Sequence, residues 1–230
     1  MSNKLKLSPL RIWLVRHGES QGNVDMDVHR THADHAIPLS EEGHRQAQRA
    51  GERLKAHLET VIADTPEESP YVRLWTSPYR RTRETAKGLL EGIGGLVTDH
   101  REDIRLCEQQ FGLFDGMSDD QRASKYKDEH EHYQKQEEFE GRFWARMPLG
   151  ESRFDVANRI HAFLGTLVRD NEKHGISKSI VVCHGVTLRA FVMQRMHLSP
   201  EWFEQESNPK NCAVRFLNGP VDEGYIFEGF

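Results

Sequence analysis

Apolar residues occur along this chain in two alternating patterns. Short continuous runs predict buried strands at residues 12–15, 71–76 and 179–183. Longer segments repeat apolar residues at helical spacing and predict helices at residues 40–61, 77–93, 152–174 and 186–197. Strands that alternate with helices imply a mainly parallel sheet with helices on both faces. The sequence therefore predicts an α/β fold, a three-layer α/β/α sandwich with a mainly parallel central sheet.

Residues with capping preferences mark where these helices begin. Ser40 precedes two glutamates, and carboxylates in a first turn suit the helix dipole. Ser77 is expected to cap the next helix, with Pro78 at its first position. Ser152, with Asp155 three residues later, resembles a capping box. Smaller elements are expected outside these helices: a short strand at 96–98, a short helix from Pro200, and two tail strands at 213–217 and 225–227.

Two polar segments interrupt the pattern. Residues 117–146 are rich in charged and amide side chains, and we expect a helical cap, inserted at about residues 117–147 of a single domain that spans residues 1–230. Residues 19–38 form a polar loop that carries His29, His32 and His35. The spacing of these histidines permits a metal site, but a solvated or substrate-facing loop is the simpler interpretation.

The chain has 230 residues and a formal net charge of −5, with no dense basic run. We therefore do not expect nucleic-acid binding, although a local positive pocket is compatible with this charge. Three cysteines without paired spacing, Cys107, Cys183 and Cys212, favour a reduced, intracellular protein. Residues 1–11 lack an apolar signal core, and no apolar run approaches the ~20 residues needed to cross a bilayer. We expect a cytoplasmic protein without membrane contact, and the oligomeric state stays open.

Two of the predicted strands end in the same way, in a histidine followed by a glycine. Arg16 and His17 end the first strand, and His184 precedes Gly185 after the third. Parallel strands bring their carboxyl ends to one edge of the sheet, where Arg81 from the helix after the second strand also arrives. Such a cluster is costly to bury unless an anion binds it, and the guanidinium fork matches phosphoryl oxygens. The pattern predicts a phosphate site.

These residue types also suggest a reaction. A neutral imidazole attacks phosphorus well near pH 7, and a phosphohistidine would divide the transfer into two steps. Arginines, and N–H groups of helices that begin after Gly18, Ser77 and Gly185, would stabilise the transferring group. Glu108 is the expected proton donor to the leaving group and the proton acceptor from the attacking water. The plainer alternatives are a surface histidine at a strand end and a glutamate in an ordinary salt bridge.

At these positions the sequence resembles the histidine phosphatase superfamily, the phosphoglycerate-mutase-like group. The stretches that carry the resemblance follow in the expected order: residues 14–20 with Asn23, 77–86, 106–112, 150–152 and 183–185. The resemblance implies that His17 is the phosphorylated nucleophile and that Glu108 is the proton donor. It also implies that no metal ion or cofactor is needed. The residues implied to bind the phosphoryl group or the substrate are Arg16, Arg81, His184, Ser20, Asn23 and Gly185.

Departures from the family pattern bear on the reaction. Gln109 and Gln110 follow the acid/base glutamate, where cofactor-dependent mutases typically begin with an arginine. A downstream pair of arginines that helps to hold a carboxylate is not evident either, since Arg142 and Arg146 are separated. We therefore expect a metal-independent phosphomonoesterase for a small phosphorylated metabolite. The alternatives are a 2,3-bisphosphoglycerate-dependent phosphoglycerate mutase, a phosphoprotein phosphatase, and a non-catalytic phospholigand-binding protein.

Overall fold

The computed structural model describes residues 8–230, and within them one sheet has the strand order β3-β2-β4-β1-β5-β6. Its strands are β1 (Arg11–Arg16), β2 (Val72–Thr76), β3 (Val97–Glu102), β4 (Lys178–Cys183), β5 (Val214–Asn218) and β6 (Val221–Phe227). β1, β2, β3 and β4 pair parallel with one another, and β5 pairs antiparallel with both β1 and β6. The sheet is therefore mixed and mainly parallel, as the sequence predicts.

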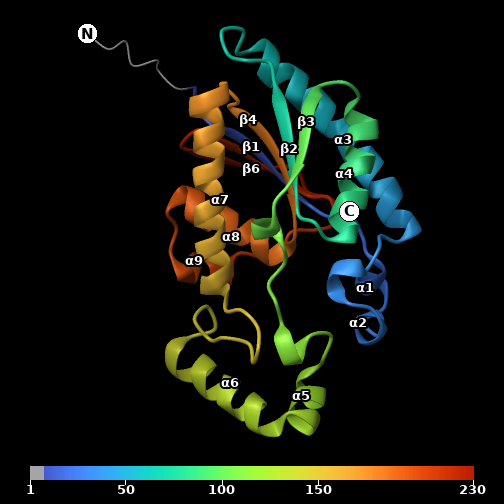
Figure 1. Cartoon of the computed structure of the whole chain (residues 1–230), viewed down its shortest axis with the longest axis vertical. Helices are drawn as coiled ribbons and strands as arrows, with labels where there is room; N and C mark the ends of the chain where they lie inside the picture. Colours follow the sequence, from blue (N-terminus) through green and yellow to red (C-terminus); the bar gives the residue numbers. More distant parts are fainter. Residues whose placement is uncertain (1–7) are drawn as a thin grey trace.

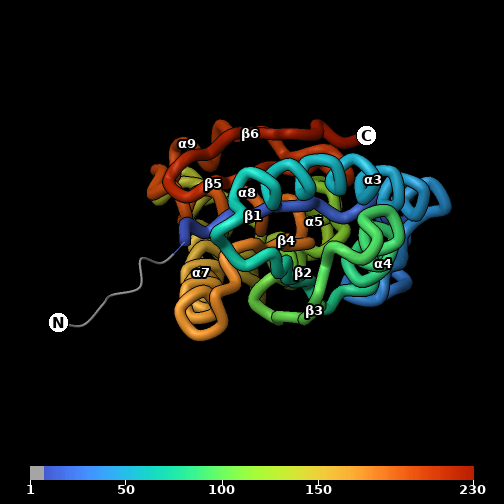
Figure 2. The backbone as a smooth tube through the Cα atoms, turned by 90° about the horizontal axis from the view of Figure 1, so that it is seen from above, coloured from blue at the N-terminus to red at the C-terminus, as the bar shows by residue number. Residues whose placement is uncertain are grey.

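Helices cover both faces of this sheet. On one face lie α3 (Glu41–Ala63) and α4 (Arg80–Ile93), and on the other lie α7 (Arg153–His174), α8 (Gly185–Met196) and α9 (Pro200–Gln205) (Figure 1). Seen from above, the strands follow one another between these two groups of helices (Figure 2). Along β1, Trp13 and Val15 join the apolar core under α3 and α4, whereas Ile12 and Leu14 join the core under α7 and α8. The predicted three-layer sandwich is confirmed.

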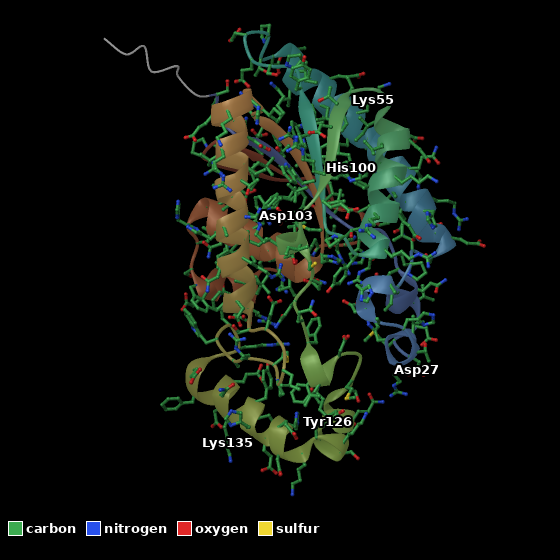
Figure 3. The ribbon with its side chains drawn as sticks, viewed as in Figure 1. Asp27, Lys55, His100, Asp103, Tyr126 and Lys135 are labelled. Atoms are coloured by element: carbon green, nitrogen blue, oxygen red, sulfur yellow. The ribbon has the colours of Figure 1, made fainter. Side chains whose placement is uncertain are left out.

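Two further groups of short elements lie away from the sheet. The segment after β1 contains α1 (Gln21–Val24), α2 (Val28–Thr31) and the 3-10 turn η1 (Asp34–Ala36), where a polar loop is predicted. After β3 come the 3-10 turns η2 (Ile104–Leu106) and η3 (Gly112–Phe114) and the helices α5 (Asp119–Lys125) and α6 (Lys127–Glu140). Figure 1 shows α5 and α6 below the main body, and Tyr126 and Lys135 mark them in Figure 3. A small apolar cluster that includes Phe114 and Tyr133 packs inside this segment.

The two chain stems that lead to α5 and α6 are tied together. The Glu151 N–H donates to the carbonyl of Gln110 at 2.8 Å, and the Leu113 N–H donates to the carbonyl of Pro148 at 3.0 Å. Gly112 has a φ of +58°, and a Cβ there would lie 2.1 Å from the Pro148 oxygen. Only glycine fits this position, and the tied stems fix where α5 and α6 leave the body.

Most of the predicted helix ends are confirmed, with one exception. The Ser40 side chain accepts the Gly43 N–H at the start of α3, and Ser152 and Asp155 form a capping box at the start of α7. The predictions of a cap at Ser77 and of Pro78 at the first helical position are wrong, because α4 begins only at Arg80. The Ser77 hydroxyl instead lies 2.9 Å from Nε2 of His184, and this contact occupies the group that would have capped the helix.

Two strands are longer than predicted, and the N-terminal residues expected to lack a signal core are only partly described. β3 extends to Glu102, and β6 begins at Val221 directly after the predicted turn. Within residues 8–230 no helix is both long and apolar enough to cross a membrane. The expectation for residues 1–11 falls mainly on residues 1–7, which lie outside the described residues.

Candidate active site

A cavity of about 370 Å³ opens where β1 ends, between the α1–η1 segment and the segment of η3 and α5. This volume is in the usual range for small-molecule sites. Of the residues predicted for the site, the cavity wall contains Arg16, His17, Ser20, Asn23, Arg81 and Glu108. The remaining wall residues are Gly22, Met26, His29, Asp34, Phe111, Phe114, Asp115, Gly116, Met117, Arg122 and Asn208. The structure therefore brings the two arginines, one histidine and the glutamate together.

His17 is held in a single orientation at the end of β1. Its Nδ1 lies 2.7 Å from the carbonyl oxygen of Gly18. Because a carbonyl oxygen can only accept, Nδ1 carries the proton and Nε2 of the neutral ring keeps its lone pair. The His17 carbonyl in turn accepts from the Cys212 N–H at 3.3 Å and from Nδ2 of Asn211 at 3.2 Å. The ring is thus prepared to act as a nucleophile through Nε2.

The turn after His17 needs glycine because another backbone lies close to it. A Cβ on Gly18 would lie 2.7 Å from the oxygen of Gly43, and a Cβ on Gly43 would lie 2.0 Å from the oxygen of Glu19. Gly18 has no positive φ, so glycine is needed here because of the close approach of the two backbones and not because of an unusual backbone conformation. The first turn of α3 therefore packs directly against the loop that carries His17.

His184 lies beside His17 but does not line the cavity. The two ring centroids are 5.2 Å apart, and the His184 side chain is fully buried. Its Nε2 contacts the Ser77 hydroxyl, and its ring packs edge-on against Tyr79 at 5.0 Å. Gly185 is not in the cavity wall either, and a Cβ there would lie 2.1 Å from Oδ1 of Asn208.

The surroundings keep both imidazoles uncharged. Burial, followed by the charges of Arg81 and Arg16, lowers the pKa of His17 well below its usual range. Burial, followed by Arg81 and His17, does the same to the pKa of His184. Neutral rings avoid adding charge to a buried region that already holds two guanidinium groups. A neutral His17 is also the form that has a free electron pair.

The two arginines differ in their partners. Nη1 of Arg16 donates to the carbonyl of Pro209 at 2.5 Å, and burial lowers the pKa of this residue. Arg81 forms a two-pronged ion pair with the carboxylate of Asp34, with N–O distances of 2.9 and 3.1 Å. The sequence did not indicate this pair, because Asp34 belongs to a polar loop without periodicity.

Glu108 is fixed against the first turn of α8. Its carboxylate accepts the N–H groups of Val186 at 3.2 Å, Thr187 at 3.3 Å and Gln109 at 3.0 Å, whereas the Thr187 hydroxyl donates to the Cys107 carbonyl at 2.7 Å. Nη2 of Arg159 also holds the Glu108 carbonyl at 3.1 Å. In the structure, two of the N–H groups that we expect to bind phosphate, those of Val186 and Thr187, donate to Glu108 instead.

Ser20 and Asn23 form the end of the first loop that faces the cavity. Each side chain bonds to the backbone N–H of the other, which makes a capping box at the start of α1. Asn211 donates to Oδ1 of Asn23 at 3.2 Å and so links this loop to the segment before β5. With four residues, α1 is too short to supply the helix dipole expected after Gly18.

Several wall residues were missed by the sequence analysis. Arg122 comes from α5, within a charged run that looks like an ordinary solvated face, and its guanidinium stacks on Phe114 at 5.1 Å. Of the three loop histidines, only His29 lines the cavity, whereas His32 contacts Thr31 and His35 packs toward Tyr79. Within the described residues, no three His, Cys, Asp or Glu side chains are grouped so that they could hold a metal ion.

Three kinds of comparison show which known proteins this chain is similar to. The model of the histidine phosphatase superfamily (branch 1) matches residues 12–225. The chain is 35% identical to the phosphoglycerate mutase-like protein AT74H of Arabidopsis thaliana, over 99% of this chain and 80% of that protein. It is 26% identical to the broad-range acid phosphatase DET1 of Saccharomyces cerevisiae, over 91% and 85% of the two chains. A solved structure of mycobacterial glucosyl-3-phosphoglycerate phosphatase with VO3 is similar, with a TM-score of 0.67, 25% identity and 90% of each chain covered.

The lowered pKa of His17 predicts a pH-dependent stability. Below about pH 6.5 the unfolded chain binds a proton at this residue, whereas the folded protein does not. The free energy of unfolding therefore decreases as the pH is lowered. When the pH is lowered from roughly 7 to 5.5, the free energy of unfolding should decrease by about 1 kcal/mol less in His17→Asn than in the native protein. Urea unfolding in phosphate-free buffer measures this, with His161→Asn on the exposed side of α7 as the control for loss of a histidine. A native pH dependence in His17→Asn would show that the folded protein does not keep this ring neutral.

Proposed function

The chain belongs to the histidine phosphatase superfamily (branch 1), and we propose that it is a metal-independent phosphomonoesterase that forms a phosphohistidine at His17. The observation that carries this proposal is the orientation of a neutral His17 beside two arginines in one cavity. Phosphatases and mutase-like proteins are both among the relatives. The finer assignments of residues and substrate are our own.

In the proposed first step, Nε2 of His17 attacks the phosphorus atom and the bond to the leaving oxygen breaks. Arg16 and Arg81 place guanidinium groups beside the transferring group, where they stabilise its negative charge. We also assign His184 to the phosphoryl site; it packs against His17, although it does not line the cavity in the structure. Glu108 supplies the proton that the departing alkoxide needs.

In the proposed second step, water attacks the phosphohistidine and the bond to Nε2 breaks. Glu108 takes the proton of this water, so the carboxyl group has the same protonation state at the end as at the start. Inorganic phosphate and an alcohol are then the products. Three N–H groups, those of Gln109, Val186 and Thr187, hold the Glu108 carboxylate in the cavity wall, where both steps need it.

We propose a small phosphorylated metabolite as the substrate, and residues 117–147 as a cap of the single domain that limits access to the cavity. Phe114 and Met117 contribute apolar surface, and Arg122 adds a cation near the mouth. Arg142 and Arg146 bind Glu137 and Asp155 and do not line the cavity, which favours hydrolysis over phosphoglycerate mutase activity.

Replacing the nucleophile tests the proposal most simply. His17→Ala should reduce hydrolysis of p-nitrophenyl phosphate by about 10³-fold or more, because it removes the Nε2 lone pair that attacks the phosphorus atom. The native protein should retain its activity in EDTA, and His161→Ala should match it. Full activity of His17→Ala would exclude His17 as the nucleophile, and loss of native activity in EDTA would exclude a metal-independent reaction. Phosphoglycerate mutase turnover that depends on bisphosphoglycerate would favour the alternative function.

The proton donor is tested by comparing two leaving groups. Nitrophenolate can leave without being protonated, whereas an alkoxide needs a proton to leave. Glu108→Gln should therefore lower kcat/KM more for an alkyl phosphate than for p-nitrophenyl phosphate. We expect a loss of about 10²- to 10⁴-fold for an alkyl phosphate and less than about tenfold for p-nitrophenyl phosphate. The ratio kcat/KM is chosen because it does not include hydrolysis of the phosphoenzyme. Equal losses for the two substrates would show that Glu108 does not protonate the leaving group.

A further inference from the structure

Arg81 already binds an anion that belongs to the protein, the carboxylate of Asp34. Its Nη1 donates to Oδ1 and its Nη2 donates to Oδ2, which is the parallel geometry that a guanidinium also offers to phosphate. Nη1 donates in addition to the main-chain oxygen of Asp34 at 2.6 Å. The Arg81 side chain is only 6% exposed and that of Asp34 17%. A phosphoryl group can therefore gain these donors only if the carboxylate gives them up.

The segment around Asp34 is anchored on both sides. Ile37 is fully buried, and the Leu39 N–H donates to Oε2 of Glu84 on α4 at 2.7 Å. On the other side, the ring of His29 fits against Gly22, where a Cβ would lie 2.5 Å from its Nε2. These anchors hold Asp34 in the cavity wall, next to Arg81.

A second partner for the carboxylate lies nearby. Nδ1 of His29 is 3.6 Å from Oδ1 of Asp34, is buried, and has no hydrogen-bond partner among the described residues. A small rotation of the Asp34 side chain would bring the two atoms into hydrogen-bond contact. The carboxylate can thus leave Arg81 without becoming an unpaired buried charge, which would be costly.

We propose that Asp34 is a specificity-determining residue that competes with the phosphoryl group for Arg81. The inference rests on the proposed function, because it concerns the same phosphate site. A ligand must displace a carboxylate from Arg81 in order to bind. A dianionic phosphomonoester can do so, whereas an anion with a smaller charge cannot. The same exchange weakens the hold on inorganic phosphate and favours release of the product.

A merely structural role for Asp34 would have the opposite consequence. If the carboxylate served only to orient Arg81, its removal would weaken phosphate binding. Arg81 has other support, since it lies in the first turn of α4 and its guanidinium stacks on the Tyr79 ring at 5.0 Å. The sign of the change in phosphate affinity therefore separates competition from orientation.

Calorimetric titration with inorganic phosphate tests the inference on the native protein, Asp34→Asn and Asp34→Ala. Both variants should bind phosphate at least about tenfold more tightly, because one negative charge beside the ligand is removed. In hydrolysis assays KM should fall more than kcat, since binding tightens while product release slows. Asp27→Asn is the matched control on the same loop: its side chain is 73% exposed, pairs with Arg30, and points away from the body (Figure 3). Its phosphate affinity should equal the native value.

Unchanged, weaker or absent phosphate binding in both Asp34 variants would overturn the inference. Two variants are used so that a local folding defect in one of them can be recognised, because Asn keeps the shape of the side chain and Ala removes it. Hydrolysis by the native protein without tighter phosphate binding in the variants would leave the proposed function standing and refute only the role of Asp34. Tighter binding without any hydrolysis would support competition and refute the proposed function.

Discussion

Two guanidinium groups and two imidazoles share a buried region at the carboxyl ends of β1, β2 and β4, and the rest of the site depends on how their charge is balanced. Burial beside Arg16 and Arg81 lowers the pKa of both histidines and so keeps them neutral. A neutral His17 that donates through Nδ1 must present a lone pair on Nε2. The same electrostatic constraint that makes the site hard to bury thus keeps the proposed nucleophile in its neutral form.

The charge of the two arginines is balanced by groups from distant parts of the chain. Asp34 reaches Arg81 from the loop after β1, and the Pro209 carbonyl reaches Arg16 from the segment before β5. Glu108 comes from the segment after the edge strand β3 and is held by the first turn of α8. Each of these segments is irregular, so the parallel strands provide a fixed platform and the loops provide the chemistry.

The sequence allowed the regular part of this arrangement to be predicted. Continuous apolar runs identified β1, β2 and β4, because strands buried on both faces have apolar residues on both sides. The His-Gly ends of two of these strands pointed to the edge of the sheet where the cavity opens. The pairing of Asp34 with Arg81 had no such signal, since it depends on how a polar loop folds back onto α4. Arg122 lies in a charged run whose pattern does not distinguish it from its neighbours. Ser77 has the local preference of a helix cap, and that preference does not reveal that His184 contacts its hydroxyl.

The central claim is that phosphate is transferred first to His17, and trapping the phosphoenzyme tests it most directly. The native protein is mixed with a radiolabelled phosphomonoester, quenched in alkali within milliseconds, digested and sequenced by mass spectrometry. The account predicts an acid-labile phosphate on the peptide that contains His17, and on no other histidine. A label on His184 instead, or turnover without any labelled protein, would contradict it.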